Sequence, residues 1–248
     1  MEESSGPDAA LSHIHAEAPL MIISHKYKFI FIKTGKTAGT SIEVFLSQHC
    51  GADDVVTPIF PHVEPHKPRN FSGYFNPVRE LYWSRGKGIR KTFSDVIKKR
   101  RFYNHLPAIK VRSRIARDIW ASYFKFCVER NPWDKTVSDF YMQRWEGGGD
   151  LSFDEYIAKN YFRLNYHMYT DDRGNVLVDK VLKYENLIDE LGYTFKRLGI
   201  PFNGSLGVNA KTEYRANRRP YHTMYSDAQK RLIEQVFDPE IRMHGYQF

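Results

Sequence analysis

The segment KTGKTAGTSIE, residues 33–43, places a lysine among glycine and hydroxyl residues directly after an apolar strand pattern, FIFI. Small residues let backbone N–H groups converge on an anion, and the positive end of a following helix points at the same place. Lys36 adds a mobile charge, and Thr37, Thr40 and Ser41 add hydroxyl donors. The segment therefore predicts a binding site for a phosphorylated ligand.

The same residues allow two other interpretations. The letters TSIE, from Thr40 to Glu43, have the spacing of a capping box, in which Thr40 caps the helix and Glu43 reaches back. The nucleoside triphosphate loop, GxxxxGK[ST], matches GKT at 35–37. Its first glycine falls on Ile30, inside the strand pattern, which disfavours an ATP-dependent small-molecule kinase.

A second junction between a strand and a helix follows at residues 123–141. YFKFCVE predicts a strand, and Asn131 and Pro132 suit the N-cap and first position of a helix. Arg130 then stands at the carboxyl end of its strand, with Ser138 about two turns into the helix. Each alone fits a structural role, Arg130 in an ion pair and Ser138 bonded to its own backbone. Together with the first loop they predict two anion sites on one sheet edge.

Strand patterns alternate with helix patterns along the rest of the chain. We expect an α/β protein with a three-layer P-loop-like fold, in which helices flank a central parallel sheet. Residues 1–20 are expected to form a flexible tail and residues 21–248 a single domain. The individual expectations are strands at about 26–33 and 123–129, a strand pair near 176–184, and helices at about 40–49, 91–101, after Pro107, from Pro132, and near 152–159, 185–198 and 226–237.

Composition restricts the partners. The 248 residues carry 37 Lys and Arg against 29 Asp and Glu, a net charge of +8 that favours anionic ligands. A nucleic-acid-binding module is a rival interpretation, but no recognised motif supports it. The two cysteines, Cys50 and Cys127, imply no disulfide framework. With no signal-peptide pattern and no membrane-spanning stretch, we expect a cytoplasmic protein without nucleic-acid or membrane partners. The sequence leaves the oligomeric state open.

The histidines give no convincing metal site. His13 and His15 lie in the expected tail, and His62 and His66 lie in a proline-rich segment. Neither pair has the helical spacing or the cysteine neighbours of a zinc site, so no metal is expected.

FIFIKTGKTAGTSIE and CVERNPWDKTVSDFY together resemble the two signature segments of sulfotransferases that use 3′-phosphoadenosine 5′-phosphosulfate (PAPS). The similar branch is the carbohydrate O-sulfotransferase-like one, of the sulfotransferase family 2 type. NHLPA at 104–108, VDKVLKYENL at 178–187 and the tail at 224–248 continue the resemblance. Gly35 departs from it, because many members have proline there.

The resemblance implies a cofactor, PAPS, with PAP as its product, and no metal. By this likeness one set of residues would hold the 5′-phosphosulfate: Lys36, Thr37, Ala38, Gly39, Thr40 and Ser41. A second set would hold the 3′-phosphate or cover the cofactor: Arg130, Ser138, Arg215, Arg218 and Arg219. Lys36 would stabilise charge on the bridging oxygen as the S–O bond breaks.

His105 is the preferred general base, since an imidazole accepts a proton near neutral pH and some similar proteins have a catalytic histidine in a comparable segment. Glu43 is the rival base. The acceptor would be a hydroxyl of a sugar or small metabolite. We expect its pocket to draw on the irregular segment 51–90, and its aromatic residues to be Tyr74, Phe75, Tyr82 and Trp83, with the loop 145–150 at its border.

Overall fold

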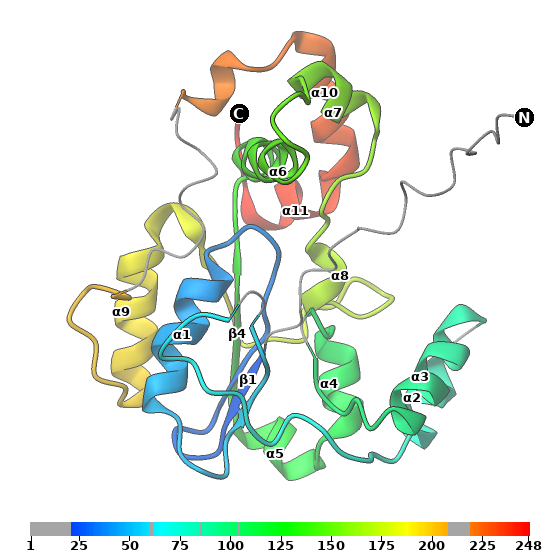
Figure 1. The fold of residues 1–248 in the computed structure, drawn as a ribbon, viewed down its shortest axis with the longest axis vertical. Coiled ribbons are helices and arrows are strands. Elements are labelled where there is room, and N and C mark those ends of the chain that lie inside the picture. The colour runs from blue at the N-terminus through cyan, green and yellow to red at the C-terminus, as the bar shows by residue number, and fades with distance from the viewer. Residues whose placement is uncertain (1–20, 60–61, 85, 104, 208–218) are drawn as a thin grey trace, which may run out of the picture.

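The computed structural model describes residues 21–59, 62–84, 86–103, 105–207 and 219–248 (Figure 1). Its sheet has five strands in the order β3-β1-β2-β4-β5. The pairs β2–β4 and β4–β5 are parallel, whereas β1 runs antiparallel to both β2 and β3. The strands are β1 (Ile22–Ser24), β2 (Phe29–Phe31), β3 (Val55–Val56), β4 (Phe124–Glu129) and β5 (Lys180–Lys183).

Helices cover both faces of this sheet (Figure 1). Alternate residues of β2 and β4 enter two separate apolar clusters, because successive strand side chains point to opposite faces. One cluster combines Phe31 and Phe126 with α1 (Gly39–His49) and α9 (Leu187–Leu198). The other combines Ile30 and Cys127 with α4 (Ala108–Arg114) and α8 (Tyr166–Tyr169).

A third apolar cluster lies beyond the carboxyl ends of β2 and β4 (Figure 1). It contains Trp133 and Phe140 of α6 (Pro132–Glu146), Tyr156 and Ile233. The other helices of this group are α7 (Phe153–Ala158), α10 (Asp227–Val236) and α11 (Asp238–His244). Their packing holds α6 above the end of the sheet where β2 and β4 terminate.

A buried cluster of ion pairs joins α4 to two further helices. Arg114 Nε lies 2.7 Å from Glu80 Oε2, and Arg114 Nη2 lies 2.8 Å from Asp95 Oδ2. Lys110 Nζ lies 2.7 Å from Glu80 Oε1. These residues connect α4 with α2 (Val78–Trp83) and α3 (Lys87–Ile97). The remaining elements are α5 (Arg117–Ser122), η2 (Tyr184–Asn186) and η3 (Tyr221–Thr223).

The expected α/β class is confirmed, with a correction to the sheet: it is mixed, not parallel throughout. The pattern at 26–33 gave β2 but missed β1, a three-residue strand that pairs antiparallel with β2 across the polar turn 25–28. The expected pair at 176–184 is one strand, β5, plus an isolated bridge at Val176. The expected tail, residues 1–20, lies outside the described residues.

Candidate functional site

The loop between β2 and α1, residues 33–38 and here called the anion loop, changes backbone handedness from residue to residue. Lys36 and Ala38 have positive φ angles of 62° and 58°, whereas Thr37 between them does not. Such alternation turns successive N–H groups toward one concave point, the geometry of a backbone anion nest. Left-handed non-glycine residues are uncommon and are found where surrounding structure enforces them.

The start of α1 adds further donors to this nest. Ala38 occupies the N-cap position and makes no side-chain cap hydrogen bond. Its methyl group cannot accept a hydrogen bond, so the N-cap residue leaves the first-turn N–H groups for another acceptor. Anions bind such helix ends readily. The loop therefore fits a phosphate or sulfate group.

The capping-box interpretation of Thr40 and Glu43 is wrong, because both residues lie inside α1. Thr40 Oγ1 accepts a hydrogen bond from Lys33 Nζ at 3.1 Å, and Glu43 Oε2 lies 3.4 Å from the same ammonium. Burial, opposed by Lys33, raises the pKa of Glu43 to about 7. Lys33 thus contacts two side chains of α1 and holds the start of this helix in place.

Lys33 also explains why residue 39 is glycine. A Cβ atom at Gly39 would come within 2.7 Å of Lys33 Cγ and Cε, which is closer than real contacts allow. The lysine stem therefore crosses the helix start where only glycine leaves room. Sequence reasoning missed Lys33. The signal that could have found it is a charged residue directly after an apolar strand, and the structure buries both faces of this strand.

The hydroxyl groups predicted to bind the ligand have protein partners here. Thr37 Oγ1 lies 2.9 Å from Thr34 Oγ1 and 3.1 Å from the Thr34 carbonyl. Thr34 in turn donates to the carbonyl of Val128 on β4. Ser41 is buried in the first turn of α1. The donors best placed for an anion are therefore backbone N–H groups.

The second predicted segment lies directly beside the anion loop. Because β2 and β4 are parallel neighbours, their carboxyl ends meet at one edge of the sheet (Figure 1). Arg130 Nη1 donates to the backbone carbonyl of Lys36 at 3.2 Å. The guanidinium also donates to Asp134 Oδ2, at 2.9 Å from Nε and 2.7 Å from Nη2. It stacks on the Tyr184 ring, 4.1 Å from the centroid.

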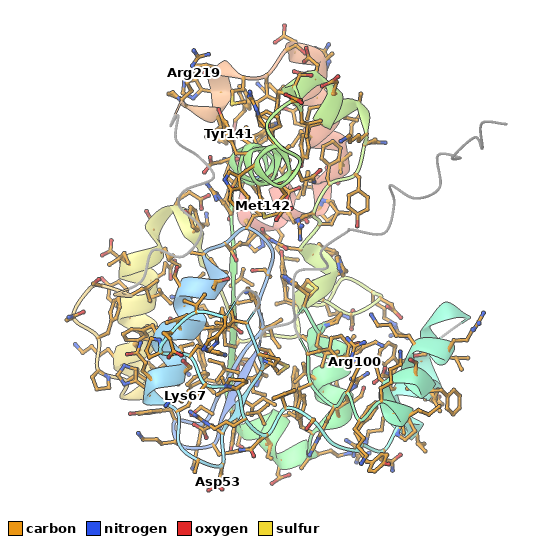
Figure 2. All side chains as sticks on the ribbon, in the orientation of Figure 1. Asp53, Lys67, Arg100, Tyr141, Met142 and Arg219 are labelled. Carbon is orange, nitrogen blue, oxygen red and sulfur yellow. The ribbon has the colours of Figure 1, made fainter. Side chains whose placement is uncertain are left out.

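Helix α6 runs over the loop from this point. Asn131 is its N-cap and accepts from Trp133 N at 3.1 Å, and Pro132 is its first residue, as predicted. Lys36 Nζ lies 3.3 Å from the sulfur of Met142, which Figure 2 labels beside Tyr141 on this helix. Ser138 is partly exposed on α6, one turn after Asp134.

Of the three late arginines, Arg215 and Arg218 lie outside the described residues. Arg219 is described, is exposed, and precedes η3 by two residues (Figure 2). The hydroxyl of Tyr221 in η3 accepts a hydrogen bond from Asn131 Nδ2 at 3.4 Å. The segment that follows Arg219 therefore returns to the N-cap of α6.

His105 lies two residues before Pro107, the N-cap of α4, and has a positive φ of 48°. Helix α4 runs opposite to β4, so its first turn lies at the sheet end that carries the anion loop (Figure 1). This places the segment of His105 at the same end of the sheet as Lys36 and Arg130.

The predicted acceptor aromatics are not brought together around Lys36. Tyr74, which precedes α2, is 66% exposed, and Tyr82, on α2, is 94% exposed. Phe75 is buried under the Arg114 guanidinium, 4.1 Å from its ring, and Trp83 Nε1 donates to Ser113 at 3.2 Å. Helices α2 and α3 lie at the side of the molecule away from α6 (Figure 1).

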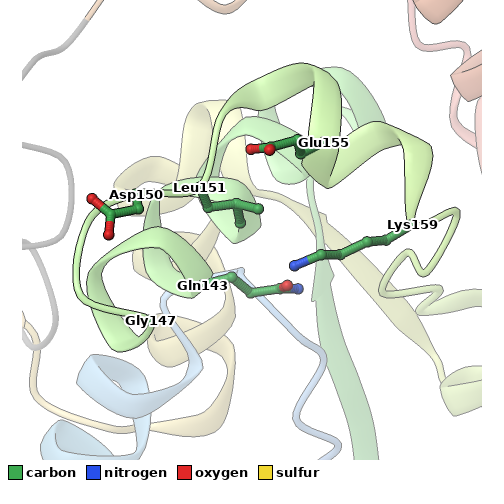
Figure 3. A pocket seen from close by; sticks show the side chains of 6 residues that line it. All are labelled: Gln143, Gly147, Asp150, Leu151, Glu155 and Lys159. Carbon is green, nitrogen blue, oxygen red and sulfur yellow. The ribbon is translucent and has the colours of Figure 1, made fainter.

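A cavity of about 420 Å³ lies at the other end of α6, between this helix and α7 (Figure 3). Its lining mixes carboxylate, amide and ammonium groups: Gln143, Gly147, Asp150, Leu151, Glu155 and Lys159. It includes part of the loop 145–150 that was expected to border an acceptor pocket. Gln143 follows Met142, the residue in contact with Lys36.

Sequence reasoning also missed Arg163 and Asn165, which reach the anion loop from the segment before α8. Arg163 forms a 2.6 Å ion pair with Asp139 of α6, and a Cβ atom at Gly35 would lie 3.6 Å from its Cδ. Asn165 bonds Gly35 directly. No local signal marks these residues, because 130 positions separate Gly35 from Asn165.

Two features are missing from the part of the chain that the structure describes. It contains no group of three His, Cys, Asp or Glu side chains arranged to hold a metal ion. None of its helices combines the length and the apolar character needed to cross a membrane.

No family model matches the chain. The crystal structure of a sulfotransferase from Alicyclobacillus acidocaldarius aligns at 18% identity over 84% of this chain and 94% of that chain, with a TM-score of 0.35. So low a TM-score gives no ground for transferring fold or function. An uncharacterized protein of Archaeoglobus fulgidus is 35% identical over 113 residues, which make up 44% of this chain and 94% of that protein. The chain therefore belongs to the same family as this archaeal protein.

Proposed function

We propose that the protein is a PAPS-dependent sulfotransferase that transfers a sulfuryl group to a hydroxyl of a sugar or small metabolite. The observation that carries the proposal is the 3.2 Å contact between Arg130 and Lys36, which joins two anion-binding segments at one sheet edge. A nucleotide with phosphate groups at both its 5′ and 3′ positions suits such a pair of sites. Both signature patterns of the resembling family fall on these segments.

The anion loop is assigned to the 5′ side of the cofactor. Backbone N–H groups from Lys36 to Ser41 would hold the phosphosulfate, supported by the alternating backbone and the N-cap of α1. Arg130 and Ser138 would hold the 3′-phosphate, where a guanidinium forms two parallel hydrogen bonds. Arg219 would approach from η3, and Arg215 and Arg218 belong to the same proposed basic segment.

PAPS would supply an activated sulfuryl group and leave as PAP. Lys36 Nζ is then the charge that stabilises the leaving phosphate oxygen, because its ammonium lies over the loop against Met142. His105 is the proposed base that accepts the proton of the acceptor hydroxyl. Glu43 is less suited to that role, since its side chain on α1 is fully buried and faces Lys33.

The acceptor is proposed to approach along α6. The cavity at Gln143 and Lys159 is a candidate for its far end, because polar groups of both charges line it (Figure 3). Amide, carboxylate and ammonium side chains together suit a hydroxylated molecule better than a purely apolar one.

The test is transfer of ³⁵S from labelled PAPS to a panel of sugars and hydroxylated metabolites, with the Lys36→Ala variant as the control. The proposal expects labelled product with the wild-type protein and transfer slower by about a hundredfold or more with the variant. Mg²⁺-dependent binding of ATP, with no binding of PAP, would instead indicate a kinase. Salt-dependent binding of oligonucleotides without PAP binding would indicate a nucleic-acid-binding module.

A further inference from the structure

A single buried asparagine forms hydrogen bonds with both backbone groups of Gly35, near the start of the anion loop. Asn165 Oδ1 accepts the Gly35 N–H at 2.8 Å, and Asn165 Nδ2 donates to the Gly35 carbonyl at 3.1 Å. This pair of hydrogen bonds, here called the clasp, joins the loop to the segment before α8. Asn165 is 2% exposed, so water does not compete for either bond.

The orientation of the Asn165 amide is fixed by a carboxylate. Its Nδ2 also donates to Glu129 Oε1 at 3.0 Å, and an ionised carboxylate only accepts hydrogen bonds. Glu129 is fully buried and pairs with Lys135 Nζ at 2.9 Å. Its Oε1 also accepts from the backbone N–H of Arg130 at 3.0 Å. Glu129 thus connects the clasp to the residue that begins the second anion segment.

The clasp requires an N–H group at position 35. A Cβ atom there would lie 3.4 Å from Asn165 Oδ1 and 3.6 Å from Arg163, so alanine fits. Proline, which the resembling pattern has at this position, cannot donate the hydrogen bond.

We propose that Asn165 is a positioning residue that sets the handedness of the anion loop, so that the N–H groups of Lys36 to Ala38 face one anion. Residue 35 immediately precedes Lys36, the first left-handed residue of the nest. Without the clasp the backbone at Gly35 could rotate. The N–H groups of residues 36–38 would then no longer point toward one anion. The ligand part of this inference rests on the proposed function; the loop geometry does not.

The test compares four single variants and one double variant by hydrogen exchange of the loop amides and by calorimetry with PAP. Asn165→Ala removes both hydrogen bonds of the clasp, and Gly35→Pro removes the one that the Gly35 N–H donates. Gly35→Ala keeps the N–H and is the matched control. Thr170→Val is the stability control, because it removes a partly buried hydrogen bond at α8, Thr170 Oγ1 to Tyr166 O at 2.7 Å, without touching the loop.

Asn165→Ala is expected to speed exchange of the Gly35 amide, which loses its acceptor, and to weaken PAP binding, each by about tenfold or more. Gly35→Pro should weaken PAP binding similarly, and adding it to Asn165→Ala should cause little further loss. Gly35→Ala and Thr170→Val should leave loop exchange and PAP affinity within about threefold of wild type.

Unchanged loop exchange in Asn165→Ala would overturn the proposal, as would equal PAP affinity in Gly35→Pro and Gly35→Ala. If Asn165→Ala does not fold, the comparison of the two Gly35 variants decides alone. If wild-type protein does not bind PAP, the proposed function fails, while loop exchange without ligand still tests the clasp.

Discussion

The Arg130 guanidinium donates to the backbone carbonyl of Lys36, across 94 residues of sequence. This bond crosses from the end of β4 to the end of β2 and places both predicted anion sites at one position on the sheet edge. The same guanidinium stacks on Tyr184 and contacts Asp134, so its plane is held in place. A preorganised fork of this kind suits a phosphate better than a lysine ammonium does.

Replacement of Arg130 tests the proposed 3′-phosphate contact. Arg130→Lys keeps the charge but loses the two-pronged contact, so PAP affinity should fall by about tenfold to a hundredfold. Affinity for adenosine 5′-phosphate, which lacks the 3′-phosphate, should change far less. Calorimetry with both nucleotides measures this. The control is Arg197→Lys, at an exposed arginine that stacks on Phe124. An equal loss for both nucleotides would remove Arg130 from the 3′ site.

Tyr184 is expected to support Arg130 through its ring alone. Tyr184→Ala removes the surface under the guanidinium and should weaken PAP binding by about twofold to fivefold. Tyr184→Phe keeps the ring and should bind as wild type does. Parallel PAP titrations of the two variants separate ring stacking from any role of the hydroxyl. Identical behaviour of both variants would contradict the stacking role.

Lys36 is predicted to act in the transfer step. Lys36→Ala should lower the rate of sulfuryl transfer by about a hundredfold or more, because a positioned charge at the leaving oxygen is removed. The exposed lysine of α9, changed as Lys196→Ala, serves as control and should keep full activity. Single-turnover transfer of ³⁵S gives the rate directly. A variant that loses only PAP affinity would assign Lys36 to binding.

His105 is predicted to act on the acceptor, not on the cofactor. His105→Ala should lower turnover by about a hundredfold and leave PAP affinity unchanged. The acidic limb of the pH–rate profile should also disappear, since an imidazole must be neutral to accept a proton. Measuring turnover from pH 5 to 8 tests both statements. Retention of that limb in the variant would point to another base.

Glu43 should make stability depend on pH. Unfolded Glu43 has the ordinary pKa of 4.5, and burial raises the folded value to about 7. Between these values the folded protein binds more protons, so the free energy of unfolding falls as pH rises through this window. Glu43→Gln removes this contribution. Relative to the variant, wild type should lose up to about 3 kcal/mol from pH 4.5 to 7. Urea unfolding at several pH values measures it, with the exposed-site variant Glu146→Gln as control. Parallel pH profiles for wild type and Glu43→Gln would contradict the shift.

Local sequence patterns predicted the parts of the site that depend on neighbouring residues. The cap of α6 by Asn131 and Pro132 is encoded within a few positions, and the structure has it as expected. The start of α1 was predicted within one residue. The side-by-side position of Lys36 and Arg130 followed from the rule that parallel strands share a carboxyl edge.

The features that sequence reasoning missed depend on tertiary contacts. The capping-box pattern at Thr40 and Glu43 is overridden because Lys33 binds both side chains. Asn165 contacts Gly35 only because α8 packs beside the sheet, a placement that no local pattern encodes. The expected acceptor aromatics failed to converge because α2 and α3 pack on α4 through the Glu80–Arg114 ion pair, away from α6.

The most direct test of the two-site account is a calorimetric titration of the wild-type protein with PAP, with adenosine 5′-phosphate and with ATP plus Mg²⁺. The account predicts one PAP bound per chain without metal, at least about tenfold tighter than adenosine 5′-phosphate. Equal affinity for PAP and adenosine 5′-phosphate, or no binding of PAP at all, would contradict it.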